Sequence, residues 1–596
     1  MIRRIFLIII HILPLYICAQ IDVVANSYFE NGEYEKALIE YEKLHEKQPR
    51  NNQYISKIVK TLQQLENYND AERFLLDLVT EKGENYPAFF IELGYNYQLK
   101  GNLLEANTYY NKALSSIESK RSHVYPVTTK FREYTLLDFT LSAYEKAMQA
   151  YPNLNFDFQI AQIYGEQGDV KKMFDSYMNL LTSNTTSLTK IERGLSGFIT
   201  ENHNNESNVL LKHSILKKAQ KEPNIIWNKL LSWLFTQERD FKNAFAQEKA
   251  IFRRDSKRID GINKLSNVIL DDHDVDISIK RNILTYISEV SRNTKIKLGA
   301  DINLLNLDIE ENENLEVVRN KYLKLLDAYG SNLESLDLHI AYAHFLGFHL
   351  HEEDNAISFL ENSLDMNFNA INKGRLKLKL ADILVLKEHF NKALIYYSQV
   401  QRNLKNSTLS QEARYKASKT SFYKGDFIFA ESQLNVLKSS TSQLFANDAL
   451  NLKLIISDSK KEEDSLQTSL KYYAKADLLA FQNKTKDAID LLNTILINHK
   501  EDPVVPLALY KQAQLFQKTG NISQAASNYE LIISDYNEGF LLDDTLFQLA
   551  KIYDKDLNQP EKAKELYENI VFNHPDSIYF VDARKRYRTL RGDTIN

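Results

Sequence analysis

Small and apolar residues recur between positions 506 and 575 with the spacing of paired helices. In the first half of this stretch they follow one another at intervals of 3, 9, 4 and 3 residues: Ala513, Phe516, Ala525, Tyr529 and Ile532. Intervals of three and four place neighbouring side chains on one face of a helix. The interval of nine leaves room for a turn, in which Gly520 can adopt the left-handed conformation that ends a helix. The spacing therefore predicts two helices that pack against each other across a tight turn.

Alanine marks the predicted crossing of each helix pair, because a small side chain lets two helix axes approach to about 8–10 Å. Equivalent alanines are 34 residues apart at Ala37 and Ala71, and 37 residues apart from Ala356 to Ala393. Alanines at corresponding places in other units include Ala37, Ala71, Ala106, Ala356, Ala393, Ala430, Ala488, Ala525 and Ala563. One helix pair cannot cover its own apolar face, so we expect consecutive pairs to stack.

The pattern resembles the tetratricopeptide repeat, whose motifs cover about half of the chain. The resemblance implies an all-α fold, a helix-turn-helix solenoid wound into a superhelical array, with a divergent helical middle where the motifs weaken. We expect a signal peptide at 1–19, an N-terminal array at 20–182, a divergent segment at 183–298, a degenerate array at 299–470 and a C-terminal array with a capping helix at 471–596.

Composition changes this interpretation little. The chain has 596 residues, and a solenoid of that length needs more repeats rather than several compact domains. A formal charge of −5 and a pI near 6.3 argue against a general nucleic-acid binder, which is usually basic. We therefore expect no nucleic acid among the partners.

The first 19 residues have the pattern of an export signal. A basic start, Met1–Arg4, precedes an apolar run from Ile5 to Cys18 that is too short for a comfortable membrane span. Ala19 fits the position before a signal-peptidase cut. A lipid anchor on Cys18 is the alternative, although Ile17 is bulky for the small position that lipoprotein signals have, and an uncleaved anchor also stays open.

The last repeats and the sequence from Asp582 to Arg586 resemble the helical scaffolds of bacterial cell envelopes, such as the repeat lipoprotein of the outer-membrane barrel-assembly machine. This resemblance implies a periplasmic or outer-membrane-associated protein. It also implies that other envelope proteins or peptides bind in the concave groove, and that any association with the outer membrane goes through partners. Such repeats serve very different partners, so the envelope location rests on analogy.

The best-known ligand site of the family is a carboxylate clamp that needs Lys, Asn and Arg at set positions of the first helices. The residues near those positions here are Asp22, Asn26, Ser56, Lys57, Lys60, Ile91 and Tyr95. This set does not make the clamp.

Four histidines gather at His339, His344, His349 and His351. His344 and His351 are seven residues apart and could share a helical face, but Gly347 lies between them and the metal motif His-Glu-x-x-His is absent. Packing or surface histidines are the simpler interpretation, so we predict no metal site here.

The sequence Asp272-x-Asp274-x-Asp276 imitates the start of a calcium loop. Ile277 stands where the sharp turn needs glycine, and Ile283 stands where a glutamate should close the loop. We interpret the segment instead as an acidic loop before a helix N-terminus, where the helix dipole favours negative charge.

The chain contains no phosphate-cradling glycine-rich loop, no Gly-x-Ser-x-Gly elbow and, after cleavage, no cysteine nucleophile. We therefore predict a non-catalytic scaffold that needs no cofactor. Two alternatives stay open: a receptor for cell-wall glycan or peptide that uses aromatic residues of the groove, and an enzyme whose site lies in the divergent middle.

The concave side of such a solenoid is lined by the first helix of each pair. Positions on these helices that are not needed for packing are the candidates for contact with a partner, and tyrosine suits this role because it offers a large contact area at low entropic cost. The predicted protein-binding residues are Tyr95, Tyr473, Asp477, Tyr510, Gln514 and Gln517.

Overall fold

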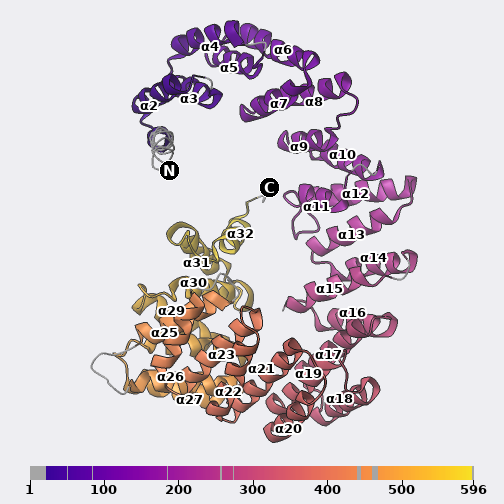
Figure 1. Ribbon diagram of the computed structural model, residues 1–596, viewed down its shortest axis with the longest axis vertical. Helices are drawn as coiled ribbons and strands as arrows, with labels where there is room; N and C mark the ends of the chain where they lie inside the picture. Colours follow the sequence, from indigo (N-terminus) through magenta and orange to yellow (C-terminus); the bar gives the residue numbers. More distant parts are fainter. Residues whose placement is uncertain are drawn as a thin grey trace, which may run out of the picture. The chain divides into compact units, whose positions relative to one another are not determined.

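The computed structural model describes residues 22–49, 51–82, 85–183, 186–255, 258–272, 274–438, 445–459 and 467–593. Within these ranges the chain forms helices joined by turns, and no residue is in a strand (Figure 1). The expected signal peptide, with Cys18 and Ala19, lies outside the described residues. In the part of the chain that is described, no helix is long and apolar enough to cross a membrane.

The chain divides into two compact units, residues 1–251 and 252–596. The first unit begins with a helix at 22–30. It continues with α2 (Tyr34–Lys47), α3 (Asn52–Gln64), α4 (Tyr68–Lys82), α5 (Ala88–Leu99), α6 (Leu103–Ser119), η1 (Arg121–His123), α7 (Val124–Glu133), α8 (Leu137–Ala150), α9 (Asp157–Glu166), α10 (Val170–Thr182), α11 (Leu188–Leu195), α12 (Glu206–Lys221), α13 (Ile225–Gln237) and α14 (Phe241–Arg254), whose last residues pass the boundary.

The second unit contains the remaining helices. They are α15 (Asp260–Asp271), α16 (Ile277–Val290), α17 (Thr294–Glu310), α18 (Leu315–Tyr329), α19 (Leu336–Phe348), α20 (Glu353–Leu364), α21 (Ala370–Leu386), α22 (Phe390–Asn403), α23 (Thr408–Tyr423), α24 (Phe427–Lys438), α25 (Ala446–Asp458), α26 (Thr468–Phe481), α27 (Thr485–Asn498), α28 (Val505–Lys518), α29 (Ile522–Asp535), α30 (Leu542–Lys551), the π-turn η3 (Ile552–Asp556), α31 (Pro560–Asn573) and α32 (Phe580–Arg591). The predicted fold class, an all-α array of helix pairs, is confirmed. The five segment boundaries expected from the sequence stay predictions.

Small residues lie where paired helices cross, as the spacing predicted. All nine alanines of the repeating set are buried. Gly94 shows the constraint most sharply, because a Cβ atom added there would come within 2.6 Å of the ring of Tyr110 in the next helix. The Tyr110 hydroxyl donates a hydrogen bond to Oε1 of Gln98, 2.9 Å away, which fixes the ring over the glycine. Any larger residue at position 94 would push the two helices apart.

The turn between paired helices needs one residue with a left-handed backbone. Gly520 has a φ of +76°, so the prediction for this turn is confirmed. Asn483 adopts the same conformation, with a φ of +60°, in the turn between α26 and α27. Asparagine tolerates it better than most residues, which explains how this turn forms without glycine.

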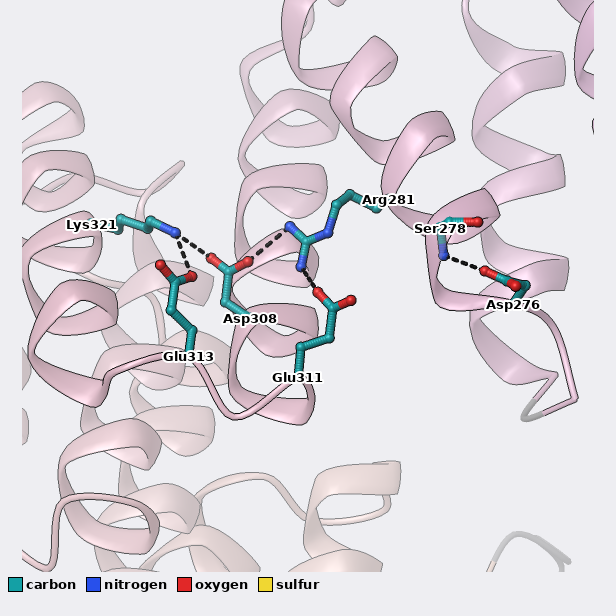
Figure 2. A network of polar contacts seen from close by, with 7 residues as sticks. All are labelled: Asp276, Ser278, Arg281, Asp308, Glu311, Glu313 and Lys321. Carbon is teal, nitrogen blue, oxygen red and sulfur yellow. Dashed lines mark hydrogen bonds and ion pairs between the residues drawn. The ribbon is translucent and has the colours of Figure 1, made fainter.

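Charged contacts join α16, α17 and α18 (Figure 2). Nη1 of Arg281 lies 2.8 Å from one carboxylate oxygen of Asp308, and Nζ of Lys321 lies 2.8 Å from the other. The other nitrogen of Arg281 pairs with Glu311, while Lys321 also reaches Glu313 at 2.8 Å. Asp308 is buried, so its negative charge is matched from both sides by helices that flank α17.

The acidic loop before α16 caps that helix. The carboxylate of Asp276 accepts a hydrogen bond of 2.7 Å from the backbone nitrogen of Ser278, as Figure 2 shows. Hydrogen bonding from the side chain of Ser278, reinforced by this backbone bond, lowers the pKa of Asp276. The interpretation as a helix N-terminus is thus confirmed, and it follows from an ordinary capping interaction.

Ala525 provides a direct test of the helix crossing. It is fully buried at the start of α29. Replacing it by leucine should overpack the crossing with α28 and lower the free energy of unfolding by about 1–3 kcal/mol. The control is Ser527→Leu, which adds the same side chain at an exposed position of the same helix. Urea denaturation of both variants measures the difference, and equal stability of the two would show that Ala525 does not mark the crossing.

Candidate functional site

The first unit has a cavity of about 760 Å³ along the inner side of its first helix pairs. Residues of the helix at 22–30, of α3, α5 and α7, and of the segments before α5 and α7 line it. These four are the first helices of consecutive pairs, and their partners α2, α4, α6 and α8 pack on the outer side. We call this cavity the inner groove.

A network of buried polar groups forms one wall of the inner groove. Glu92 on α5 is 1% exposed, and Oγ of Ser56 on α3 donates a hydrogen bond of 2.6 Å to its Oε1. Nζ of Lys130 on α7 lies 2.8 Å from the same carboxylate oxygen and 3.1 Å from Oγ of Ser56. Three consecutive first helices are thereby joined through a single carboxylate.

Further charges complete this network. Lys130 also lies 2.9 Å from the carboxylate of Glu133, which pairs in turn with Lys60. The hydroxyl of Tyr134 donates to the second oxygen of Glu92.

Burial alone would lower the pKa of Lys130, but the carboxylates of Glu92 and Glu133 outweigh this effect, and the pKa is raised. Burial, reinforced by the charge of Glu92, raises the pKa of Tyr134, so its hydroxyl stays protonated.

The contact between Ser56 and Lys130 does not make a nucleophile. A lysine that activates a serine must be neutral, which requires a lowered pKa. The raised pKa of Lys130 keeps its amine as an ammonium ion at neutral pH. The network joins three first helices and forms one wall of the inner groove.

Lys57 is a further cation of the inner groove, and it differs from Lys60 and Lys130. It is half-buried on α3, and its Nζ lies 5.6 Å from the ring centre of Phe29 and 5.8 Å from that of Tyr41. These are cation–π distances. No carboxylate among the described residues pairs with Lys57.

Aromatic residues supply apolar surface beside these charges. Tyr54 and Phe89 are buried in the wall, whereas Tyr86 is 46% exposed. The rings of Tyr86 and Phe89 lie 6.0 Å apart, so they form a connected apolar surface at the start of α5. The groove thus offers both apolar area and charge to a ligand.

The predicted residue Tyr95 lies next to the inner groove. It is half-buried, and its ring stacks on that of Tyr134 with centres 4.0 Å apart and planes 15° apart. Because Tyr134 bonds to Glu92, Tyr95 supports the polar wall from behind. Tyr95 is not among the residues that line the cavity.

The other predicted residues lie in the second unit, and the structure corrects the expectation that Tyr473 is not needed for packing. Tyr473 is 6% exposed and belongs to the core, with its ring 6.3 Å from that of Phe422. The packing of α26 against α23 covers it. Whether any of the six predicted residues contacts a partner stays a prediction.

Asp477 lies one turn after Tyr473 and is engaged by two lysines. Nζ of Lys419 on α23 and Nζ of Lys511 on α28 each lie 2.7 Å from its carboxylate. Burial would raise the pKa of Asp477, but the two ammonium groups outweigh it and hold the pKa well below its usual range. A similar ion pair joins Asp382 to Lys416 at 2.8 Å. Lys416 follows Asp382 by 34 residues, and Lys511 follows Asp477 by the same number.

The remaining predicted residues gather on α28. Tyr510 is half-buried and packs edge-on against Tyr529, whose hydroxyl donates a hydrogen bond of 2.9 Å to Oε1 of Gln517. Gln514 is exposed and, with Asp477, lines a cavity of about 330 Å³. The structure therefore brings Asp477 and Gln514 together but uses Gln517 inside a repeat.

Part of the inner side of the second unit is occupied by the chain itself. Nε2 of Gln482 donates a hydrogen bond of 2.8 Å to the backbone oxygen of Leu386, 96 residues away. Nδ2 of Asn483 reaches the backbone oxygen of Phe348 at 3.3 Å, and the ring of Phe348 lies 5.4 Å from that of Phe481. The ends of α19, α21 and α26 thus meet. The larger cavity lies in the first unit.

Two residues of the inner groove, Glu92 and Lys130, were missed from the sequence. Glu92 follows Ser56 by 36 residues and Lys130 follows Glu92 by 38, whereas the left-handed turn residues Glu66, Gly101 and Thr135 are 35 and 34 residues apart. The three residues therefore lie on consecutive first helices but at different places in the repeat. The repeat spacing alone gives no signal that they meet.

Known proteins provide one comparison that bears on the fold. The sequence profile described as "Tetratricopeptide repeat" matches residues 507–537 and 544–577. These two segments are tetratricopeptide repeats. They correspond to α28 with α29 and to α30 with α31, and the tetratricopeptide assignment of the C-terminal region is thereby confirmed.

Other comparisons add less. No curated protein matches the chain. A chain of the complex described as "Structure of Naa15/Naa10 bound to HypK-THB" aligns over 96% of this chain and 96% of that chain, with 12% sequence identity and a TM-score of 0.30. A likeness of this size supports no conclusion about partners.

Two histidines of the cluster in the second unit, His339 and His344, pack against neighbouring side chains, whereas His351 is exposed. His339 is buried, with Nδ1 2.9 Å from Oγ of Ser363, and the ring of His344 lies 4.3 Å from that of Phe348. Among the residues that the structure describes, no group of three or more potential ligands could hold a metal ion. Burial, reinforced by the ammonium group of Lys379, lowers the pKa of His344 to about 3.

This lowered pKa predicts a dependence of stability on pH. The unfolded chain binds a proton at His344 near the ordinary histidine pKa of 6.5, whereas the folded chain does so only near pH 3. The stabilisation is therefore complete above pH 6.5 and is lost as the pH falls from 6.5 towards 3. His344→Gln should reduce this loss, and the exposed His213→Gln should not. Urea denaturation between about pH 7 and pH 5 measures both, and an unchanged slope in His344→Gln would contradict the assignment.

Proposed function

We propose that the chain is a non-catalytic scaffold that binds partner proteins, and that the inner groove of the first unit takes an extended segment of a partner. The observation that carries this proposal is the cavity of about 760 Å³ on the inner faces of four consecutive first helices. The tetratricopeptide repeats of the C-terminal region agree with an interaction role.

The dimensions of the groove favour a chain segment over a small ligand. Neighbouring helix axes are separated by about 8–10 Å, so three intervals extend over about 24–30 Å. An extended chain advances about 3.3 Å per residue, so about seven to nine residues would cross the four helices.

The chemistry of the groove favours binding over catalysis. Lys130 is held as an ammonium ion, and Ser56 donates its hydrogen bond to Glu92, which the same ammonium ion binds. The polar wall is thus preformed and matched in charge before any partner arrives. A preformed wall lowers the conformational cost of binding.

Site-specific crosslinking tests the groove. Gln53 lines it and is exposed, so a photoreactive residue at position 53 should capture partner proteins in living cells. The matched control places the same residue at Glu42, which is exposed on α2, the outer helix of the first pair. Mass spectrometry identifies the captured chains. Equal capture at both positions, or binding of the full chain to isolated cell wall without any protein captured, would contradict a protein-binding groove.

We further propose that this scaffold works in the bacterial cell envelope. The support is the basic start, the short apolar run and the junction between Ala19 and Gln20 in the sequence. The resemblance of the chain end to envelope scaffolds agrees with export.

Export predicts a defined mature start. After expression in a bacterial host, the mature chain should begin at Gln20, and N-terminal sequencing of the secreted fraction measures this. Ala19→Leu should block the cut, because the position before the cleavage site takes a small residue. A lipid-modified Cys18, or a chain that keeps Met1, would show that the proposed processing is wrong.

A further inference from the structure

The smaller cavity, in the second unit, has an excess of positive charge. Its volume is about 330 Å³, and residues of α23, α26 and α28 line it. Lys511 and Lys518 line it together with Asp477, and Nζ of Lys419 lies 2.7 Å from the same carboxylate. Three ammonium groups thus accompany one carboxylate, which leaves two positive charges in excess. We call this cavity the lysine pocket.

The neighbouring side chains do not remove this excess. Nζ of Lys518 donates a hydrogen bond of 3.2 Å to Oδ1 of Asn483, which is a neutral amide, and no carboxylate among the described residues pairs with it. The carboxylate of Glu388 lies near the end of α26, where Nε2 of Gln482 reaches it at 3.4 Å. Glu388 is already paired with Lys475 at 2.7 Å.

A comparable ion pair in the same unit has no such excess. Lys416 binds Asp382, and Glu412 lies on Lys416 as well, at 3.0 Å. Lys379 lies 4.0 Å from Asp382, so two ammonium groups there face two carboxylates. Ammonium groups that lie close together without enough carboxylates repel one another. An anion that enters the lysine pocket would relieve this repulsion.

Aromatic rings give the lysine pocket an apolar side. Tyr423 and Phe481 both line it and are half-buried, with ring centres 6.1 Å apart. Leu515 is buried in the same wall. A flat apolar group can pack against these side chains while a charged group attached to it reaches the lysines.

The lysine pocket is closed on one side by the chain itself. Gln482 and Asn483 follow Phe481 directly, and they bond to the backbone oxygens of Leu386 and Phe348 at 2.8 and 3.3 Å. A partner chain therefore cannot continue past this end of the cavity. A small molecule has no flanking chain to accommodate, and it can enter where α28 exposes its side chains.

We propose that the lysine pocket binds a small phosphate monoester of a planar ring, whose phosphate pairs with Lys511 and Lys518 and whose ring packs on Phe481. A phosphate monoester carries a charge of about −1.5 to −2 at pH 7, which matches an excess of two cations. Lys511 gives one donor to Asp477 and has others left, because an ammonium group has three. This inference is independent of the proposed function, since the inner groove belongs to the other unit.

Isothermal titration calorimetry of the full chain with phenyl phosphate tests the proposal. Phenyl phosphate should bind at least about tenfold more tightly than inorganic phosphate, which lacks the ring, and phenol should not bind at the same concentrations. Lys518→Gln should weaken the binding of phenyl phosphate about tenfold, whereas Lys518→Arg should leave it within about twofold. The matched control is Lys424→Gln, because Lys424 is also exposed and also bonds to an asparagine, Asn391, at 3.1 Å.

A variant of the apolar side separates the two parts of the ligand. Phe481→Leu should reduce the advantage of phenyl phosphate over inorganic phosphate and leave the affinity for inorganic phosphate unchanged. Thermal melting of each variant shows whether it is folded. Lys518 is exposed, so its variants keep the test valid if Phe481→Leu unfolds.

Each other outcome overturns the inference in a distinguishable way. Equal affinity for phenyl phosphate and inorganic phosphate would remove the ring from the ligand. Unchanged affinity in Lys518→Gln would show that the phosphate binds elsewhere. Tighter binding of a heptapeptide with a central phosphotyrosine than of phenyl phosphate would show that the ligand is a modified partner chain and not a small molecule. Absence of binding at millimolar phenyl phosphate would overturn the lysine pocket as a site, while crosslinking at position 53 would still test the inner groove.

Discussion

The close approach of paired helices is the constraint on which the rest of this structure depends. Buried alanines recur at the crossings, and Gly94 accepts the ring of Tyr110 where even a Cβ atom would come within 2.6 Å. A crossing this tight fixes which side of each first helix faces its partner. The opposite side then faces inward along the array, where it is free to carry other chemistry. Packing on one side of the helix thus defines the functional side.

The inner sides of the first unit are held in place by a network of polar contacts. Glu92 ties α3, α5 and α7 together through Ser56 and Lys130, so the wall of the groove is held by ion pairs that are largely removed from water. Removing one member of a buried ion pair is costly, because the other member would remain as a buried charge without a partner. Lys57 lies outside this network, with its ammonium group over the rings of Phe29 and Tyr41.

The repeat register could be predicted from the sequence because it depends on local spacing. Ala525, Tyr529 and Ile532 are buried as expected, and Gly520 has the left-handed backbone that its turn requires. The same reasoning predicted only part of the candidate site. Tyr95 lies beside the inner groove, but Tyr473 is in the core, since its exposure depends on how closely α26 approaches α23. The distance between these two helices depends on how several repeats pack together.

Inner positions have different surroundings in the two units. In the second unit Gln482 bonds to Leu386 across 96 residues. There Tyr473 lies in the core and Asp477 is engaged by Lys419 and Lys511. In the first unit the inner positions surround a cavity of about 760 Å³. The same register therefore yields an ion-paired interior in one unit and an inner groove in the other, and the groove is where a partner can reach the inner faces of the first helices.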